Sequence, residues 1–237
     1  MNSYVLISVS DKTNIEIIAS HYIEAGYHIL STGGSYKYLI DRLPEYREKI
    51  VKLSDVTGFP EILDGRVKTL HPKIYGSLLC DLEKQSHIQQ CEEHQIPDIK
   101  TVIVNLYPFH KTTLDSQSSH SDIIENIDIG GVTLIRAAAK NYKYITVIVD
   151  PNDYGDVINN MSSITTDYRH YLAGKAFKII SEYDSHISNY FNTQESKSNS
   201  TPESYSRNYQ LSQELKYGCN PYQKKAGIYT ISENNPF

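Results

Sequence analysis

The sequence has no tryptophan, and it has two methionines and three cysteines among its 237 residues. The number of cysteines is odd, and none of them (Cys80, Cys91 and Cys219) belongs to a CxxC pair. This scarcity argues against a disulfide framework and against a structural zinc site, and it fits a reducing compartment. The nine histidines show no HExxH or similar ligand spacing, so no metal site is predicted.

Long apolar runs and an excess of positive charge are also missing. No stretch approaches the roughly 20 apolar residues that span a bilayer, and the start, MNSYVLISVSDK, lacks the basic and apolar regions of a signal peptide. The net charge of −5 argues against a general nucleic-acid binder, although a local cationic pocket for a small anion is compatible with it. We expect a soluble cytoplasmic protein with no membrane and no nucleic-acid partner.

What the chain does contain is an alternation of short β-branched runs with helical patterns. Strands are predicted over residues 4–9, 27–30, 49–53, 99–105 and 144–149, and helices over 13–25, 36–42, 121–127, 132–140, 152–160 and 166–191. This order predicts an α/β fold with a Rossmann-like parallel sheet flanked by helices. Residues 58–76, GFPEILDGRVKTLHPKIYG, are predicted as a long loop or broken helix between two of these units.

The composition changes near residue 192. A domain is predicted over 1–191, a Ser/Asn-rich linker over 192–210, and a short segment over 211–237. That last segment has one strand-like patch, AGIYTI, and is too short to be a stable domain alone.

Polar motifs follow several of the predicted strands, at the edge where open α/β sheets bind ligands. The turn STGGS (31–35) suits a phosphate, because its glycines let backbone N–H groups approach and its hydroxyls add donors. SVSDK (8–12) adds two hydroxyls and a lysine. Each also has an ordinary interpretation: STGGS as a simple strand-to-helix turn, and SVSDK as a helix cap formed by Ser10 or Asp11.

Three further motifs carry groups suited to anion recognition or proton transfer. GRVKTLHP offers Arg66, Lys68 and Thr69 within four residues, or it is a solvated basic loop paired with nearby acids (Asp55, Glu61 or Asp64). IDIGG and the helix after it carry Asp128 and Lys140, which could relay protons, or which are a helix cap and an exposed lysine. NLYPF carries Asn105 and Tyr107, for which core packing of the aromatic residues is the alternative. His71 precedes a proline, and we expect a structural role with a ring hydrogen bond to the backbone.

Together these stretches resemble a known family. SVSDKT, STGG, SDVTGFPEILDGRVKTLHPKI, NLYPF, ENIDIGGVTLIRAAAKN and TVIVDPNDY occur in the order seen in IMP cyclohydrolase, the N-terminal half of the bifunctional purine enzyme AICAR transformylase/IMP cyclohydrolase. The resemblance covers about residues 3–191 and implies a methylglyoxal synthase-like fold. It also implies closure of the purine ring of FAICAR (5-formamidoimidazole-4-carboxamide ribonucleotide) to IMP with loss of water, no cofactor or metal, and a homodimer.

The resemblance also implies the site residues. The catalytic set is Lys68, Tyr107, Asp128 and Lys140. Arg66, Thr69, Asn105 and Gly130 contact the nucleotide or shape the pocket, and the 5′-phosphate is held by Ser10, Lys12, Ser31, Thr32, Gly33 and Gly34. The sequence departs from the family pattern at Tyr75, where a His is common, at Ser77, where a Gly is common, and at Ser35, where Thr is usual.

The tail segment LKYGCNPYQ resembles RYGxNPHQ, which opens the transformylase half of this family. Lys216 and Tyr222 replace an Arg and a His that help hold the transformylase substrate. Because the rest of that half is absent from this sequence, transformylase activity is not expected. Two other readings remain open: another enzyme of the same fold, such as methylglyoxal synthase, and a non-catalytic purine-nucleotide-binding or regulatory domain.

Overall fold

The computed structural model describes residues 2–195, 204–220, 222–223 and 225–230. It divides into two compact units, Met1–Ile180 and Ser181–Phe237. The domain boundaries predicted at residues 191 and 210 stay a prediction, and part of the predicted linker lies outside the described residues.

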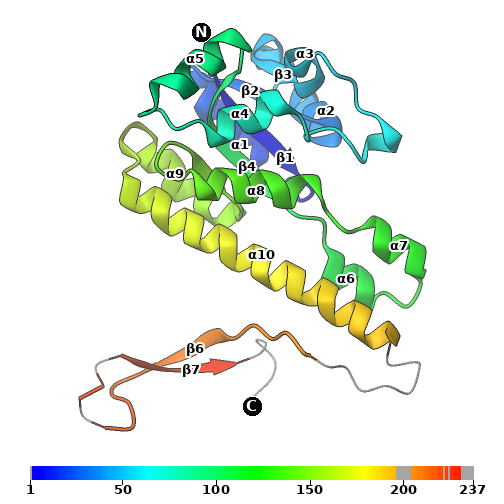
Figure 1. Ribbon diagram of the computed structural model, residues 1–237, viewed down its shortest axis with the longest axis vertical. Helices are drawn as coiled ribbons and strands as arrows, with labels where there is room; N and C mark the ends of the chain where they lie inside the picture. The colour runs from blue at the N-terminus through cyan, green and yellow to red at the C-terminus, as the bar shows by residue number, and fades with distance from the viewer. Residues whose placement is uncertain (1, 196–203, 221, 224, 231–237) are drawn as a thin grey trace. The chain divides into compact units, whose positions relative to one another are not determined.

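A five-stranded parallel sheet forms the centre of the first unit (Figure 1). Its strand order is β3-β2-β1-β4-β5. The strands are β1 (Ser3–Val9), β2 (His28–Ser31), β3 (Ile50–Lys52), β4 (Asp98–Asn105) and β5 (Thr146–Ile148). All five predicted strands are therefore confirmed, and so is the parallel α/β fold.

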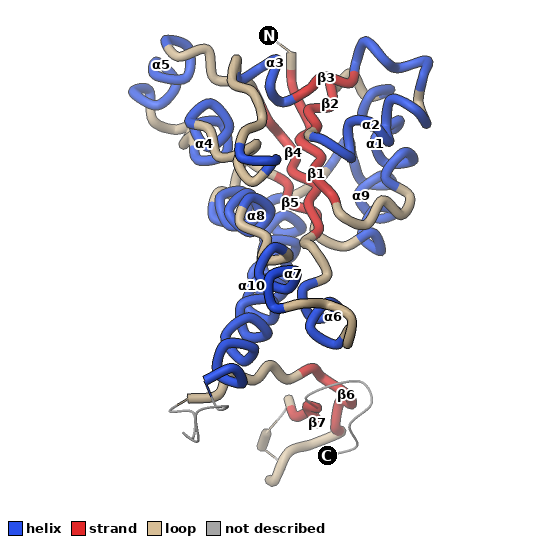
Figure 2. The backbone as a smooth tube through the Cα atoms, turned by 90° about the vertical axis from the view of Figure 1, so that its right-hand side faces the viewer, coloured by secondary structure: helices blue, strands red, loops and turns tan. Residues whose placement is uncertain are grey.

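Helices cover both faces of this sheet (Figure 2). The α-helices are α1 (Ile15–Glu24), α2 (Gly33–Arg42), α3 (Leu53–Thr57), α4 (Pro72–Leu79), α5 (Gln85–Glu93), α6 (Phe109–Leu114), α7 (His120–Glu125), α8 (Gly130–Lys140), α9 (Tyr154–Asn160) and α10 (Thr166–Glu195). Short 3-10 helices are η1 (Pro44–Lys49), η2 (Leu63–Gly65), η3 (Pro151–Asp153) and η4 (Met161–Ser163). The predicted helices are all found, whereas α3, α5 and α6 were not predicted. Residues 58–76, predicted as a long loop or broken helix, contain η2 and the start of α4.

The two-residue period of the strands produces two cores. Val5 and Ile7 point to the side of α1, α2 and α9, whereas Leu6 points to the side of α4, α8 and α10. Leu134 and Ile135 of α8 are completely buried in the second core, because this helix lies directly against β4 and β5. The start of α8, which carries IDIGG, is thereby fixed beside the carboxyl end of β4.

The second unit contains an antiparallel pair of strands, β6 (Gln210–Leu215) and β7 (Ala226–Thr230). The predicted strand AGIYTI corresponds to β7, with its last residue outside the described ones, whereas β6 was not predicted. Within this unit, Asn189 Nδ2 donates to the carbonyl of Ser206 at 2.7 Å, and the Ser206 N–H donates back to Asn189 Oδ1 at 3.3 Å.

Candidate functional site

A pocket of about 670 Å³ opens at the carboxyl ends of the parallel strands. Because every strand points the same way, the motifs that follow β1, β2 and β4 meet at this edge. Eleven of the fourteen predicted site residues line the pocket: Ser10, Lys12, Thr32, Gly34, Arg66, Lys68, Thr69, Asn105, Tyr107, Asp128 and Gly130. Ser31, Gly33 and Lys140 are not among the lining residues.

The side chain of Asn105 joins the ends of β4 and β1. Its Oδ1 accepts hydrogen bonds from the backbone N–H groups of Ser10, at 2.6 Å, and Asp11, at 2.9 Å. Its Nδ2 donates to the carbonyl of Asp11 at 2.8 Å. Asn105 therefore shapes the turn after β1, in addition to lining the pocket.

The STGGS turn is attached to β1 through its two serines. Ser31 is fully buried and its Oγ donates to the carbonyl of Ile7 at 2.8 Å. Ser35 Oγ donates to the carbonyl of Val9 at 3.0 Å and accepts from the Val9 N–H at 3.1 Å. The proton of the Ser31 hydroxyl is therefore used inside the sheet, and the phosphate contact of Ser31 stays a prediction.

The middle of this turn carries the features of an anion site. Gly33 adopts a φ of 41°, a left-handed conformation that favours glycine, and α2 begins at this residue. Lys12 Nζ would lie 3.9 Å from a Cβ added to Gly34, so a cation stands beside the amino end of the helix. The N–H of Gly33 is already used: it donates to Glu61 Oε1 at 3.1 Å.

The IDIGG turn holds the carboxylate of Asp128 in place. Asp128 Oδ1 accepts from the N–H of Gly131 at 2.7 Å. A Cβ on Gly131 would lie 2.6 Å from Asp128 Oδ2, and one on Gly130 would lie 2.7 Å from Thr69 Oγ1. Both positions therefore require glycine, because Asp128 and the Lys68–Thr69 segment come too close to this turn for a larger residue.

The groups around Asp128 shift the pKa of its carboxyl group in opposite directions. Burial raises the pKa of its carboxyl group, while the N–H groups of Gly131 and Tyr107 and the charge of Lys68 act to lower it, with burial the largest effect. A carboxylate whose pKa is raised binds a proton more readily at neutral pH, which suits general-base chemistry.

Arg66 crosses the pocket to α7. Its guanidinium binds the carboxylate of Glu125, with Nε 3.2 Å from Oε1 and a second bond from Nη2 to Oε2. The hydrogen bond from Arg66 lowers the pKa of Glu125, and the same bond raises that of Arg66. The sequence-based alternative named Asp55, Glu61 or Asp64 as partners, and it missed Glu125, because no local pattern connects residues 59 positions apart.

His71 has the predicted structural role, since its Nδ1 accepts from the N–H of Lys73 at 3.2 Å at the start of α4. Lys140 lies at the far end of α8 from Asp128, about 15 Å along the axis from Gly130 at 1.5 Å per residue. The structure therefore does not bring Lys140 together with Lys68, Tyr107 and Asp128 in one chain.

Comparison with known proteins agrees with this geometry. Residues 14–133 match the model of the MGS-like domain, and residues 138–236 match the model of the AICARFT/IMPCHase bienzyme. The chain belongs to the MGS-like domain family. The fold and the family resemblance predicted from the motifs are thereby confirmed.

The MGS-like chain also has close relatives among curated proteins. It is 48% identical over 230 residues to the bifunctional purine biosynthesis protein PurH of Thermoanaerobacter sp. (strain X514), and 46% identical over 228 residues to PurH of Oceanobacillus iheyensis. Each match covers 95% of this chain and 44% of the relative, so the chain spans less than half the length of these proteins and corresponds to their N-terminal half. A solved structure titled "Crystal structure of ForH" matches with a TM-score of 0.70 at 33% identity, covering 80% of this chain and 97% of that one.

The described residues contain neither a membrane-spanning helix nor a cluster of metal ligands. Among residues 2–195, 204–220, 222–223 and 225–230, no helix is long and apolar enough to cross a membrane. Within the same ranges, no three His, Cys, Asp or Glu side chains gather as ligands for a metal ion.

Proposed function

We propose that the chain is an IMP cyclohydrolase that closes the purine ring of FAICAR to give IMP in purine biosynthesis. The observation that carries the proposal is the grouping of Lys68, Tyr107 and Asp128 around one pocket, beside the glycine-rich turn of α2. The similarity to proteins named PurH supports the same reaction.

The reaction needs positioning and proton transfer but no external reactant. The carboxamide nitrogen forms a bond to the formyl carbon and loses one proton, and the formyl oxygen takes up a proton to become a hydroxyl. That hydroxyl then leaves as water, with the proton of the formamide nitrogen, as the C=N bond forms. Because both reacting groups are on one molecule, the enzyme contributes mainly by holding the reactive rotamer.

We assign Asp128 as the base that accepts the carboxamide proton, since burial raises its pKa. Lys68 and Tyr107 line the same pocket and would donate hydrogen bonds to the formyl oxygen as it becomes a hydroxyl. The phosphate would bind near Lys12, Thr32 and Gly34, where a lysine and a helix amino end meet. Ser10, Arg66, Thr69, Asn105 and Gly130 would contact the nucleotide or shape the pocket.

Lys140 enters the proposal through a second copy of the chain. It is exposed at the carboxyl end of α8, beside a cavity of about 620 Å³ that α4, α8 and α10 line. We propose a homodimer in which Lys140 of one subunit completes the site of the other. We also propose that the enzyme acts in the cytoplasm, which fits the free thiols of Cys80, Cys91 and Cys219.

The direct test is a spectrophotometric assay of IMP formation from FAICAR with purified protein and Lys68→Ala. We expect turnover to fall about 100-fold or more in the variant, the usual effect of losing a group that moves protons. Lys84→Ala is the matched control, because Lys84 pairs with Asp81 outside the pocket, and its turnover should equal that of the wild type. A folded wild-type protein that binds IMP without turnover would instead favour a non-catalytic nucleotide-binding domain.

A further inference from the structure

Tyr75 connects α4 to the first turn of α8. Its hydroxyl lies 2.7 Å from Thr133 Oγ1, although the two residues are 58 positions apart. Tyr75 is half-buried and does not line the pocket of Asp128; it lies on the other side of the start of α8. In the sequence, Tyr75 stands out only as a departure from the family pattern.

The direction of these hydrogen bonds follows from counting protons. Thr133 Oγ1 lies 2.9 Å from the carbonyl oxygen of Ile129 and 3.0 Å from that of Gly130, and both of these oxygens can only accept. When Thr133 donates its single proton to one of these carbonyls, the phenol of Tyr75 is the donor to Thr133. Burial raises the pKa of Tyr75, so the phenol keeps the proton that it donates.

Packing of α8 on β4 and the bond from the Gly131 N–H to Asp128 hold one side of this turn, and the hydroxyl of Thr133 binds its carbonyl oxygens. Gly130 and Gly131 have no side chains that could pack, and the close approach of Thr69 and Asp128 excludes any larger residue. Glycine loses more conformational freedom on folding than other residues, so a glycine pair needs external contacts to hold one conformation. The two carbonyls bound by Thr133 belong to residues of this turn, and the N–H that binds Asp128 belongs to the next residue, Gly131.

We propose that Tyr75 is a positioning residue for Asp128, acting through Thr133 and the backbone of residues 129–131. The proposal rests on the cyclohydrolase function, since it concerns the base of that reaction. Tyr75 does not line the pocket of Asp128. Its hydroxyl fixes the turn from behind, so that the carboxylate stays buried and aimed at the carboxamide nitrogen.

The kinetic test compares variants that break the hydrogen bond between the hydroxyls of Tyr75 and Thr133 with a variant that keeps it. Tyr75→Phe and Thr133→Val break it, whereas Thr133→Ser keeps the hydroxyl. The first two should lower kcat about 10-fold with KM within twofold, because misplacing a reacting group affects turnover more than binding. Thr133→Ser should keep wild-type turnover.

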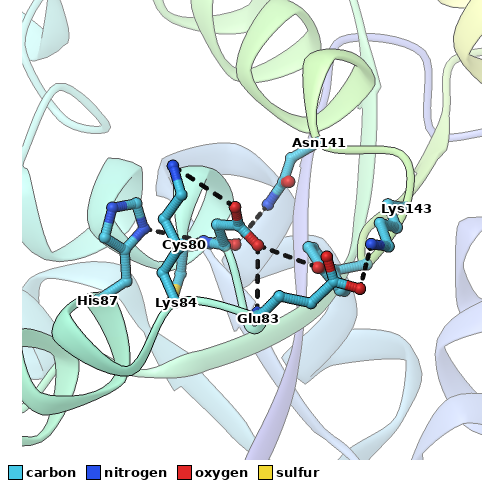
Figure 3. Close-up of polar contacts among 8 residues, drawn as sticks. Cys80, Glu83, Lys84, His87, Asn141 and Lys143 are labelled. Carbon is cyan, nitrogen blue, oxygen red and sulfur yellow. Dashed lines mark hydrogen bonds and ion pairs between the residues drawn. The ribbon is translucent and has the colours of Figure 1, made fainter.

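A matched control is available in another tyrosine. Tyr144 donates to Asp81 Oδ1 at 3.0 Å, next to the Glu83–Lys143 ion pair shown in Figure 3, and it lies outside the pocket of Asp128. Tyr144→Phe therefore removes an equivalent hydroxyl bond without touching the turn. Equal kcat values for Tyr75→Phe and Tyr144→Phe would overturn the proposal.

A second readout does not depend on activity. The pKa of Asp128 can be followed by carboxyl ¹³C NMR, with Asp128→Asn identifying the signal. The titratable and charged groups near this carboxylate are Lys68 and Tyr107 in the pocket and Tyr75 behind it, and the Arg66–Glu125 pair lies across the pocket.

In Tyr75→Phe the turn loosens and water reaches the carboxylate, so its pKa should move down toward the ordinary value, with no change in Tyr144→Phe. An unchanged pKa in Tyr75→Phe would overturn the positioning role. If the wild-type protein lacked cyclohydrolase activity, the proposed function would fail, and the NMR titration would still decide whether Tyr75 holds Asp128.

Discussion

At the scale of single residues, the burial of Asp128 links the proposed chemistry to stability. Its pKa is raised in the folded protein, so the native state binds this proton more tightly than the unfolded chain does. The resulting stabilisation is fully present below the ordinary pKa of 3.8 and is lost as the pH rises through the raised value. At neutral pH the charged carboxylate therefore lowers the free energy of unfolding.

Asp128→Asn should consequently raise the free energy of unfolding at pH 7 while it lowers turnover, and the stability gain should shrink below pH 4. Urea denaturation at both pH values measures the effect. Asp122→Asn is a control of opposite sign, because hydrogen bonds from Ser119 lower the pKa of Asp122 and stabilise its charged form. A loss of stability at pH 7 in Asp128→Asn would contradict this account.

Several of the predicted site residues that line the pocket owe their position to the end of a strand. Lys12, Asn105 and Tyr107 each follow an apolar run, and a parallel sheet brings such ends to one edge. Ser31 belongs to the same kind of motif, but its hydroxyl points into the sheet, and a motif does not specify that direction. Glu125 and Tyr75 were missed because their partners are distant in sequence and the contacts arise only from packing.

At the scale of elements, the segment between α3 and α4 is attached to the site at two points. Glu61 accepts from the N–H of Gly33 at α2, and Arg66 binds Glu125 of α7. Between them Leu63 and Asp64 have φ values of 53° and 54°, a left-handed conformation that costs a leucine about 1–2 kcal/mol. The two attachments hold this segment in a conformation that its own residues disfavour.

The carboxylate of Glu61 takes an N–H at the helix end where we place the phosphate. Glu61→Gln should therefore tighten IMP binding roughly two- to fivefold, because a charge at a helix terminus contributes about 0.3–1 kcal/mol. Isothermal titration calorimetry measures the change, and Glu93→Gln on α5 is the control on an exposed residue. Weaker binding in Glu61→Gln would mean that Glu61 supports the phosphate site rather than competing for it.

Element prediction failed where apolar periodicity was weak. In α5 no residue is buried, so the sequence carries no apolar stripe. In α4, Pro72 at the first turn resembles a loop signal, although proline is tolerated there because that N–H has no partner within the helix. Strands β1, β2, β4 and β5 were predicted because they are largely buried on both faces and appear as apolar runs.

At the scale of the whole molecule, the position of Lys140 makes the proposed dimer testable. Asp128→Asn and Lys140→Ala should each be nearly inactive. Co-expressed in equal amounts, they should recover about a quarter of wild-type activity, because half of the dimers are mixed and each mixed dimer has one intact site. The measurement is turnover of the purified mixture.

The control mixture is Asp128→Asn with Lys68→Ala. Lys68 and Asp128 belong to the same pocket of one chain, so no mixed dimer contains an intact site. Recovery in this control would indicate subunit rearrangement of another kind, and no recovery in the first mixture would remove Lys140 from the site.

The contact of Asn105 with the turn after β1 has a consequence for synthesis of the protein. The two backbone N–H groups that it fixes, those of Ser10 and Asp11, are 95 and 94 residues earlier in the chain. A nascent chain that has emerged only as far as β3 already contains STGGS and Lys12, yet the turn beside them has no partner. We therefore expect ribosome-bound chains to gain affinity for phosphate-bearing nucleotides abruptly, once β4 has left the exit tunnel and paired with β1.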